Sequence, residues 1–456
     1  MKARILLSAC AAVAGLSGCA LAPVQSWEKG EMARTDMLIQ GEALETRFNE
    51  HIYASKEASS GGAAIGGGGL RLQLTGKRMD KPKNNSPQAL LAAAMLLPGM
   101  GAVHAETPPE RGSVSVKALY YKEDQPGLDR ISVRSPSVSV LAPVAGEWTI
   151  AGSATVDDVS GATPRYHTAI SGASRMDDLR KAGDVMVTRY LPHGTVSVGG
   201  AYSKEHDYRS RALSLQGTYS SDDKNTTWAF GISGTDDAID PVNRLVVNES
   251  RQTVSFLAGV TRVLTPVDIA ALTLTHSSGH GYYSDPYKLL DNRPRSRDQS
   301  TALLQWNHRF MAQDATSRLS YRFYRDSFGI QAHTLGAEWV QSLAGGWTLT
   351  PSVRLYSQGK ADFYFDPVYD PVFGPPFPRG YVIGSEVFSS PDQRLSAFGA
   401  VTVGFKLAKQ IDRDWSVDLK LERYEQRGSW RMFGSGSPGL EPLRAVSVQL
   451  GVTRLW

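Results

Sequence analysis

The chain has 456 residues, of which 41% are hydrophobic, and its formal net charge is only +4. This balance gives no reason to expect nucleic-acid binding, and no apolar run reaches the roughly 18 residues that a membrane-spanning helix needs. The two cysteines, Cys10 and Cys19, both lie near the N-terminus. The rest of the chain can therefore hold neither a disulfide framework nor a thiolate metal site.

The first residues have the layout of a bacterial export signal. Lys2 and Arg4 precede an apolar stretch, 5–16, and Leu16-Ser-Gly-Cys19 follows. This order resembles the signal and lipobox of bacterial lipoproteins, in which cleavage leaves the cysteine as an acylated N-terminus. We expect residues 1–18 to be the signal peptide and Cys19 to anchor the chain on the periplasmic side of the outer membrane. The alternative is an ordinary secretory signal that contains a cysteine.

Residues 19–57 form a small lipoprotein module, and a Gly/Ser-rich linker, 58–76, follows it. Helix-forming residues occupy 31–50, but so short a module cannot bury a useful core. A glycine-rich linker is flexible by composition. The sequence therefore predicts a tethered tail that is partly helical and partly disordered.

A second export signal lies inside the chain, at 77–105. Four basic residues precede the apolar run 89–97, Pro98 ends that run, and Val103-His-Ala105 has the small residues of a signal cleavage site. We expect Ala105 to be the last residue of this signal-like segment, although a buried helix is the alternative. In this layout the chain resembles two exported proteins joined end to end.

Repeated strand patterns fill the remainder, 106–456. The last strand shows the pattern well, because Val446, Val448, Leu450 and Val452 alternate with small or polar residues up to Trp456. Such alternation places one set on each face of a strand. The pattern predicts sixteen strands, at about 112–122, 129–141, 147–157, 183–191, 194–203, 208–219, 226–235, 251–264, 267–276, 299–310, 316–326, 331–342, 346–357, 393–407, 413–424 and 444–456.

The connections between these strands alternate in length. Every second connection is short, as at 192–193 and 265–266, whereas many of the others are long, as at 158–182 and 358–392. Short turns at one end, long loops at the other and an even strand number are typical of outer-membrane barrels. We therefore predict an all-β chain that forms a transmembrane antiparallel barrel of about sixteen strands. The aromatic-rich loop 358–392 is expected to fold over its mouth.

The face opposite the lipid is expected to line the lumen. Charges of both signs fall on it, and two interpretations are open: a salt-bridge network that fills a narrow barrel, or the selectivity lining of a water-filled channel. The predicted lining residues are Arg309, Arg318, Arg322, Glu338, Arg354, Asp418, Lys420 and Glu422.

One short motif points to a cofactor. Asp157, Ser160, Gly161, Ala162 and Thr163 stand at the spacing of the sequence at which a periplasmic transferase attaches FMN through a phosphoester to a threonine. Small residues beside the acceptor leave it accessible to the transferase. Thr163 is thus a candidate for covalent FMN, and an ordinary turn rich in Asp, Ser and Gly is the alternative.

Several stretches of the barrel region together resemble one family of Gram-negative outer-membrane barrels of unknown function, domain-of-unknown-function family 3570. The N-terminal module resembles a small lipoprotein family that is often encoded beside it. Such neighbourhoods include an FMN transferase and a thioredoxin-like protein, so the resemblance implies a cell-envelope redox setting. The stretches are Ser160-Gly-Ala-Thr-Pro164, Glu205-His-Asp-Tyr208, Asp223-Lys-Asn-Thr226, Ser284-Asp-Pro-Tyr-Lys288, Tyr321-Arg-Phe-Tyr324, Pro351-Ser-Val-Arg-Leu-Tyr-Ser-Gln358 and Ala361-Asp-Phe-Tyr364.

These observations favour a non-enzymatic barrel that acts as a channel or conduit in an envelope redox system. A flavin-carrying electron-transfer protein on a barrel scaffold is the first alternative. An outer-membrane enzyme is the second, but the chain has no G-x-S-x-G motif and no convincing catalytic triad. The expected partners are outer-membrane lipid, the barrel-assembly machinery, the FMN transferase and the thioredoxin-like protein. No metal site is expected.

Overall fold

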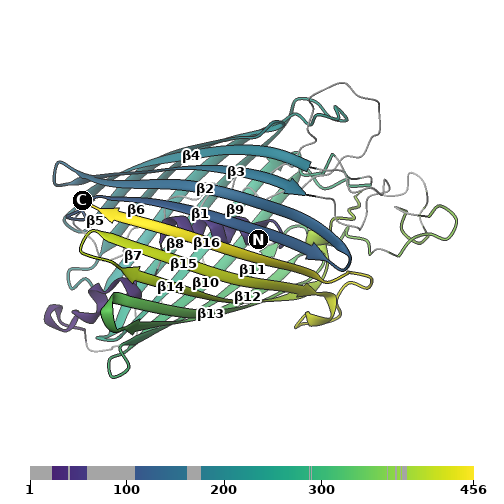
Figure 1. The fold of residues 1–456 in the computed structure, drawn as a ribbon. Helices are drawn as coiled ribbons and strands as arrows, with labels where there is room; N and C mark the ends of the chain where they lie inside the picture. Colours follow the sequence, from purple (N-terminus) through teal and green to yellow (C-terminus); the bar gives the residue numbers. More distant parts are fainter. Residues whose placement is uncertain are drawn as a thin grey trace.

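In the computed structural model the chain forms a closed antiparallel barrel, as predicted (Figure 1). The structure describes residues 23–39, 42–58, 108–161, 176–286, 288, 290–366, 368–374, 377–380, 382 and 388–456. Within these ranges sixteen strands pair in chain order, and β1 (Ser113–Gln125) closes on β16 (Leu443–Leu455). The predicted fold class and strand number are therefore confirmed. The ends of the predicted modules at residues 18, 76 and 105 lie outside the described residues.

The fourteen strands between these two follow the chain without a crossover. Their bounds are β2 Leu128–Val144, β3 Trp148–Gly161, β4 Met176–Leu191, β5 Gly194–Lys204, β6 Tyr208–Ser220, β7 Thr226–Ile239, β8 Glu249–Thr265, β9 Asp268–Gly281, β10 Ser296–Phe310, β11 Ala315–Asp326, β12 Gln331–Leu343, β13 Trp347–Gln358, β14 Phe398–Gln410 and β15 Trp415–Arg427.

The barrel closes where the two ends of the sheet meet. Ser113 of β1 pairs with Leu455 of β16, and the ladder continues to Asp124 and Arg444. Just beyond it, Gly112 and Trp456 exchange backbone hydrogen bonds of 3.1 and 3.2 Å between N–H and carbonyl. A closed ladder leaves no strand edge that could pair with another chain.

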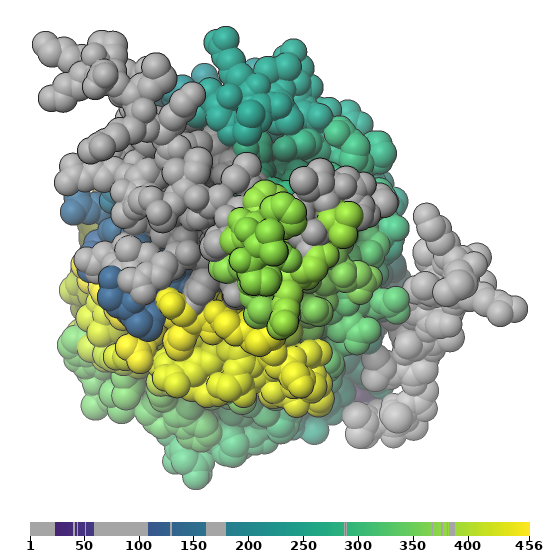
Figure 2. Space-filling model, turned by 90° about the vertical axis from the view of Figure 1, so that its right-hand side faces the viewer, coloured from purple at the N-terminus to yellow at the C-terminus, as the bar shows by residue number. Residues whose placement is uncertain are grey.

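The two ends of the barrel differ. At one end, which we call the short-turn end, the strands are joined by the turns 145–147, 192–193, 221–225, 266–267, 311–314, 344–346 and 411–414. The other end, the long-loop end, carries the long connections after β3, β7, β9, β13 and β15. Figure 2 looks onto this end, where the green loop after β13 lies beside the yellow loop after β15. Ser437 donates to the carbonyl of Ala397 at 2.8 Å and joins the two loops.

Apolar side chains cover the outer wall. Leu213, Leu450 and Val403, on three different strands, are each more than half exposed, as expected for a surface that faces lipid. Tryptophans gather at the short-turn end, among them Trp148, Trp347, Trp415 and the terminal Trp456. Aromatic girdles of this kind mark a membrane interface. The wall is therefore that of an outer-membrane barrel.

Several strands are longer than predicted at the long-loop end. β3 runs to Gly161 rather than 157, and β4 begins at Met176 rather than 183, with the two residues paired. Beyond the lipid both faces of a hairpin meet water, so the hydrophobic alternation fades while the hydrogen-bond ladder continues. A prediction based on alternation therefore ends strands such as β3 and β4 too early. The strand predicted at 393–407 is too long at this end, because Gln393–Leu395 form a 3-10 helix and β14 begins at Phe398.

Helices make up much of the described N-terminal region. Three short 3-10 helices, η1 (Ser26–Glu28), η2 (Glu31–Ala33) and η3 (Thr35–Met37), lie at the short-turn end, and helix α2 (Ala43–Ala54) lies within the barrel (Figure 1, purple). We call residues 23–39 and 42–58 together the lumen segment. The predicted helical character of this module is confirmed, and the barrel wall supplies the core that the module lacks. Among the described helices, none is long and apolar enough to span a membrane.

Candidate functional site

Apolar contacts hold the lumen segment at both of its ends. At the short-turn end Val24, Met32 and Met37 pack against Val263 and Ile269, beside the turn between β8 and β9. At the long-loop end the buried residues Phe48, Ile52 and Ala58 of the segment join a cluster made by the strands and loops there; its wall members include Tyr121, Phe328, Tyr356, Leu395 and Tyr424. The segment therefore crosses the lumen from end to end.

Between these anchors the contacts are charged. Two acidic residues at the start of the range 42–58 meet three lysines from the sector of the wall between β14 and β1: Lys117 of β1, Lys406 of β14 and Lys420 of β15. Glu42 lies 2.8 Å from the ammonium of Lys117, and Glu45 lies 2.6 Å from that of Lys406 and 3.1 Å from that of Lys420. The Lys117 side chain is completely buried. A buried ammonium is tolerated only when it is paired, so the burial of Lys117 depends in part on its contact with Glu42.

A basic residue of α2 reaches a different sector of the wall. Arg47 donates to Asp184 of β4 at 2.8 Å and also contacts Ser153 of β3. The helix is thus tied to both sides of the β1–β16 seam. Because α2 carries both signs of charge and each sign meets its opposite on the wall, the rotation of the helix about its axis is specified.

The last residues of the segment meet β13 and the aromatic cluster. Arg354 makes a bidentate pair with Glu57, with N–O distances of 2.7 and 2.6 Å, and its guanidinium lies 3.8 Å from the centre of the Tyr53 ring. Lys56 donates to the hydroxyl of Tyr121 at 3.0 Å and lies over the ring of Tyr424. Bidentate geometry and cation–π stacking give directional contacts, so the end of the segment is held in one orientation.

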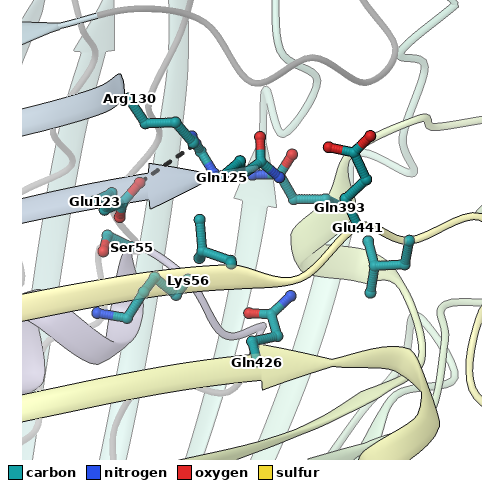
Figure 3. A pocket seen from close by; sticks show the side chains of 10 residues that line it. Ser55, Lys56, Glu123, Gln125, Arg130, Gln393, Gln426 and Glu441 are labelled. Atoms are coloured by element: carbon teal, nitrogen blue, oxygen red, sulfur yellow. Dashed lines mark ion pairs between the residues drawn. The ribbon is translucent and has the colours of Figure 1, made fainter. Parts of the chain in front are cut away.

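A small cavity separates this end of the segment from the wall (Figure 3). Ser55 and Lys56 line it together with β1, β2, β15 and β16, and an ion pair of 3.4 Å joins Arg130 to Glu123 on its far side. The cavity has a volume of about 10 Å³ and can hold about one water molecule. The cavity is too small for a cofactor or an organic substrate.

At the short-turn end the segment meets arginines of the wall. Arg309 of β10 lies 3.1 Å from Glu31 and 3.5 Å from Asp36. Arg318 of β11 donates to the carbonyls of Asp36 and Thr35, at 2.8 and 3.1 Å. Backbone carbonyls at helix ends are natural acceptors for a guanidinium, so Arg318 holds η3 in place.

A buried ionic cluster connects two loops at the long-loop end. It consists of Asp285, Lys288, Asp291, Arg293, Asp392 and Arg394, which we call the loop clamp. Arg293 donates to Asp291 and to Asp392 at 2.6 and 2.7 Å, and Lys288 lies 3.3 Å from Asp392. No side chain of the clamp is more than 9% exposed. The loop after β9 is therefore fixed to the loop after β13, as expected for a loop that folds over the mouth.

Electrostatic effects within the clamp move two carboxyl groups in opposite directions. Burial raises the pKa of Asp285 to about 6, against the opposing effect of Lys288. Burial would also raise the pKa of Asp392, but Arg394, Lys288 and Arg293 outweigh it and hold that pKa well below its usual range. Asp392 is therefore the permanent anion at the centre of the clamp, and Asp285 is its titratable member.

All eight residues predicted to line the lumen lie on strands of the barrel. The positions next to them along each strand face the lipid. Four of them contact the lumen segment directly: Arg309, Arg318, Arg354 and Lys420. Asp418 pairs with Lys117, which also pairs with Glu42 of the segment, and Arg322 interacts electrostatically with Glu50. Glu338 pairs with Arg318 at 3.5 Å, and Glu422 with Lys420 at 3.0 Å. The sequence interpretation missed the segment itself and three wall residues, Lys117, Asp184 and Lys406.

The FMN motif is only partly described. Asp157 faces the lumen, where Arg180 donates to it at 2.7 Å and Ser135 also bonds to it, and it is 6% exposed. Ser160 and Gly161 are the last residues of β3, so the connection that follows is shorter than the predicted 158–182. Ala162 and Thr163 lie outside the described residues. In the folded barrel Asp157 is thus buried and paired.

Over the described ranges no group of three or more His, Cys, Asp or Glu side chains is arranged to hold a metal ion. Asp370, in the loop after β13, accepts backbone hydrogen bonds from Val372 at 2.8 Å and from Gly380 at 2.9 Å and organises its own turn.

Two family models match the chain. A family model described as a protein of unknown function (DUF3570) matches residues 170–443, and a domain of unknown function (DUF4266) matches residues 24–69. No curated protein matches the chain.

Solved outer-membrane barrels are similar at low identity. A bacterial polysaccharide outer membrane secretin has a TM-score of 0.43 at 10% identity, with 75% of this chain and 98% of that chain covered. CdiB from Acinetobacter baumannii has a TM-score of 0.42 at 10% identity over 74% and 60% of the two chains. The outer membrane protein opdK from Pseudomonas aeruginosa has a TM-score of 0.37 at 8% identity over 76% and 99%. Identities this low carry no information about substrate.

Proposed function

The chain belongs to the DUF3570 family of proteins of unknown function, and we propose that it is an outer-membrane conduit that its own lumen segment closes. The observation that carries this proposal is the path of the segment, which crosses the lumen from the short-turn end to the long-loop end and contacts strands around the wall. Passage of a solute then requires the segment to move.

The charged contacts between the lumen segment and the barrel wall support a segment that can leave the lumen. Replacing buried ion pairs with well-packed apolar residues is often neutral or stabilising, so a charged interface is not needed to hold a permanent plug. A wall that carries Lys117, Arg354, Lys406 and Lys420 is well hydrated once the segment is absent, whereas an apolar wall would collapse or aggregate. The same charges therefore suit both a closed state and an open, water-filled state.

The solute that passes would then belong to the cell-envelope redox system that the family resemblance implies. We propose a role in a flavin-linked envelope system and assign the barrel no catalytic step. The second candidate, a covalently flavinylated electron-transfer protein, rests on the motif that ends at Thr163. The geometry of this motif favours the conduit, because Asp157 pairs with Arg180 inside the lumen.

Single-channel conductance of the full chain in planar bilayers tests this proposal. We expect the wild type to be closed for most of the time and the double variant Glu45→Lys/Glu57→Lys to conduct for much longer, because each change places like charges together. Arg111→Glu is the matched control, since Arg111 pairs with Asp414 on the outside of the short-turn end. Equal open fractions in the double variant and the wild type would refute a closing role for the segment.

A further inference from the structure

Noncovalent contacts join the lumen segment to the barrel wall, and the charges on the two sides of these contacts are opposite. Its acidic residues Glu31, Glu42, Glu45 and Glu57 meet basic residues of β1, β10, β13, β14 and β15, and its basic residue Arg47 meets Asp184 of β4. Apolar anchors at each end add contact area that excludes water. This is the arrangement of a protein–protein interface, in which buried anchors supply affinity and matched charges supply register.

The two places where the described chain leaves the lumen segment and enters the barrel lie at opposite ends. Ala58 accepts from Arg297 and donates to Gln358, at the long-loop end. Arg111 bonds to Arg413 and Asp414 in a turn of the short-turn end. The contacts named above join the described residues 23–58 directly to the barrel wall.

We propose that the lumen wall is a binding surface for residues 23–58 as a separate polypeptide, so that the segment stays in place when the chain is cut between it and the barrel. The partner that fits this surface is a short peptide with an acidic first helical turn, an arginine two residues after Glu45, and a C-terminal Tyr-Ala-Ser-Lys-Glu sequence, Tyr53 to Glu57. The barrel is then the receptor half of a two-component assembly. This inference goes beyond the proposed function, because it holds whether or not the lumen conducts.

Cleavage of the folded full-length protein tests the proposal directly. A recognition sequence for a specific protease is inserted in the glycine-rich stretch at 66–69, and Cys19→Ala is introduced so that acyl chains cannot hold the fragment in the detergent micelle. After complete cleavage and gel filtration, we expect the N-terminal fragment to elute with the barrel in a one-to-one ratio, measured by intact mass. Elution of the fragment by itself, while the barrel remains folded by its mobility on unboiled gels, would overturn the proposal.

A charge exchange tests the specificity of the surface. In the cleaved protein Glu57→Arg should release the fragment roughly a hundredfold faster or more, because it leaves Arg354 buried opposite a like charge. Arg354→Glu in the same chain should restore much of the retention. Glu28→Arg is the control, because Glu28 is exposed and accepts a hydrogen bond from the backbone amide of Gln25 in its own turn. Equal release from the single and the exchanged variant would show that the pair does not contribute to recognition.

Discussion

Arg354 of the barrel wall and Glu57 of the lumen segment, 297 residues apart in the chain, form a bidentate ion pair in which the Glu57 side chain is completely buried. Removing one partner of a buried pair leaves the other charge without compensation, at a cost of about 3–5 kcal/mol. Arg354→Leu should therefore release the end of the segment. Hydrogen exchange of the amides of 43–58 reports the release, and Arg454→Leu, on the outer face, should leave that exchange unchanged.

The closing contact between Gly112 and Trp456 predicts a steric effect on barrel closure. A Cβ at position 112 would lie 2.5 Å from two atoms of the Trp456 ring. Gly112→Val should therefore lower the temperature at which the unboiled, faster-running form of the protein is lost from gels. Gly234→Val is the control, because a Cβ there has no neighbour within 4 Å. If both variants melt at the wild-type temperature, the terminal contact does not support closure.

The loop clamp predicts a pH dependence. The pKa of Asp285 is raised from 3.8 to about 6, so the clamped state prefers the protonated form. Its stabilising effect is complete below about 3.8 and is lost as pH rises through about 6, which is the sign for an acid whose pKa is higher in the folded state. The two loops should separate more readily at pH 7 than at pH 5, with distance measured between spin labels at positions 290 and 388.

Asp285→Asn should abolish that difference between pH 5 and pH 7, because an amide does not titrate. Asp370→Asn is a useful comparison, since Asp370 lies outside the clamp, in the loop after β13 that also carries Asp392 and Arg394. A spin-label distance that changes equally with pH in wild type and Asp285→Asn would contradict the assignment to this carboxyl.

The lipobox predicts that Cys19→Ala abolishes acylation and leaves insertion of the barrel intact, because the ladder that closes the barrel is formed by β1 and β16, far from Cys19 in the sequence. Metabolic labelling with a fatty acid and gel mobility of the outer-membrane fraction measure the two properties separately. Loss of the barrel from the outer membrane in this variant would mean that anchoring and insertion depend on each other.

Thr163 is predicted to carry covalent FMN when the chain is made together with a periplasmic FMN transferase. Because Asp157 is buried in the folded barrel, the modified fraction should rise when folding of the barrel is slowed. Intact mass and in-gel flavin fluorescence of wild type against Thr163→Val measure it. A wild-type mass without the FMN increment, in the presence of active transferase, would leave 157–163 as an ordinary strand end.

The sequence by itself determined the barrel. Alternation along strands such as β15 and β16 fixes which residues face lipid, since each strand has an apolar and a polar face, and the unequal turns identify the two ends. The inward position of Arg354, Asp418 and Lys420 follows from the same local pattern. Strand ends outside the lipid were predicted less well, because the pattern disappears where both faces meet water.

Only the tertiary structure decided what fills the lumen. The segment at 23–58 has too few apolar residues to reveal a partner, and its charges are typical of a solvated helix when they are considered alone. Glu45 acquires a role because Lys406, 361 residues away, lies on the facing wall. The same holds for the loop clamp, where Arg293 and Asp392 meet only after the strands have brought their loops together. Such pairs form only when the barrel closes and brings distant residues together, so a local sequence pattern does not predict them.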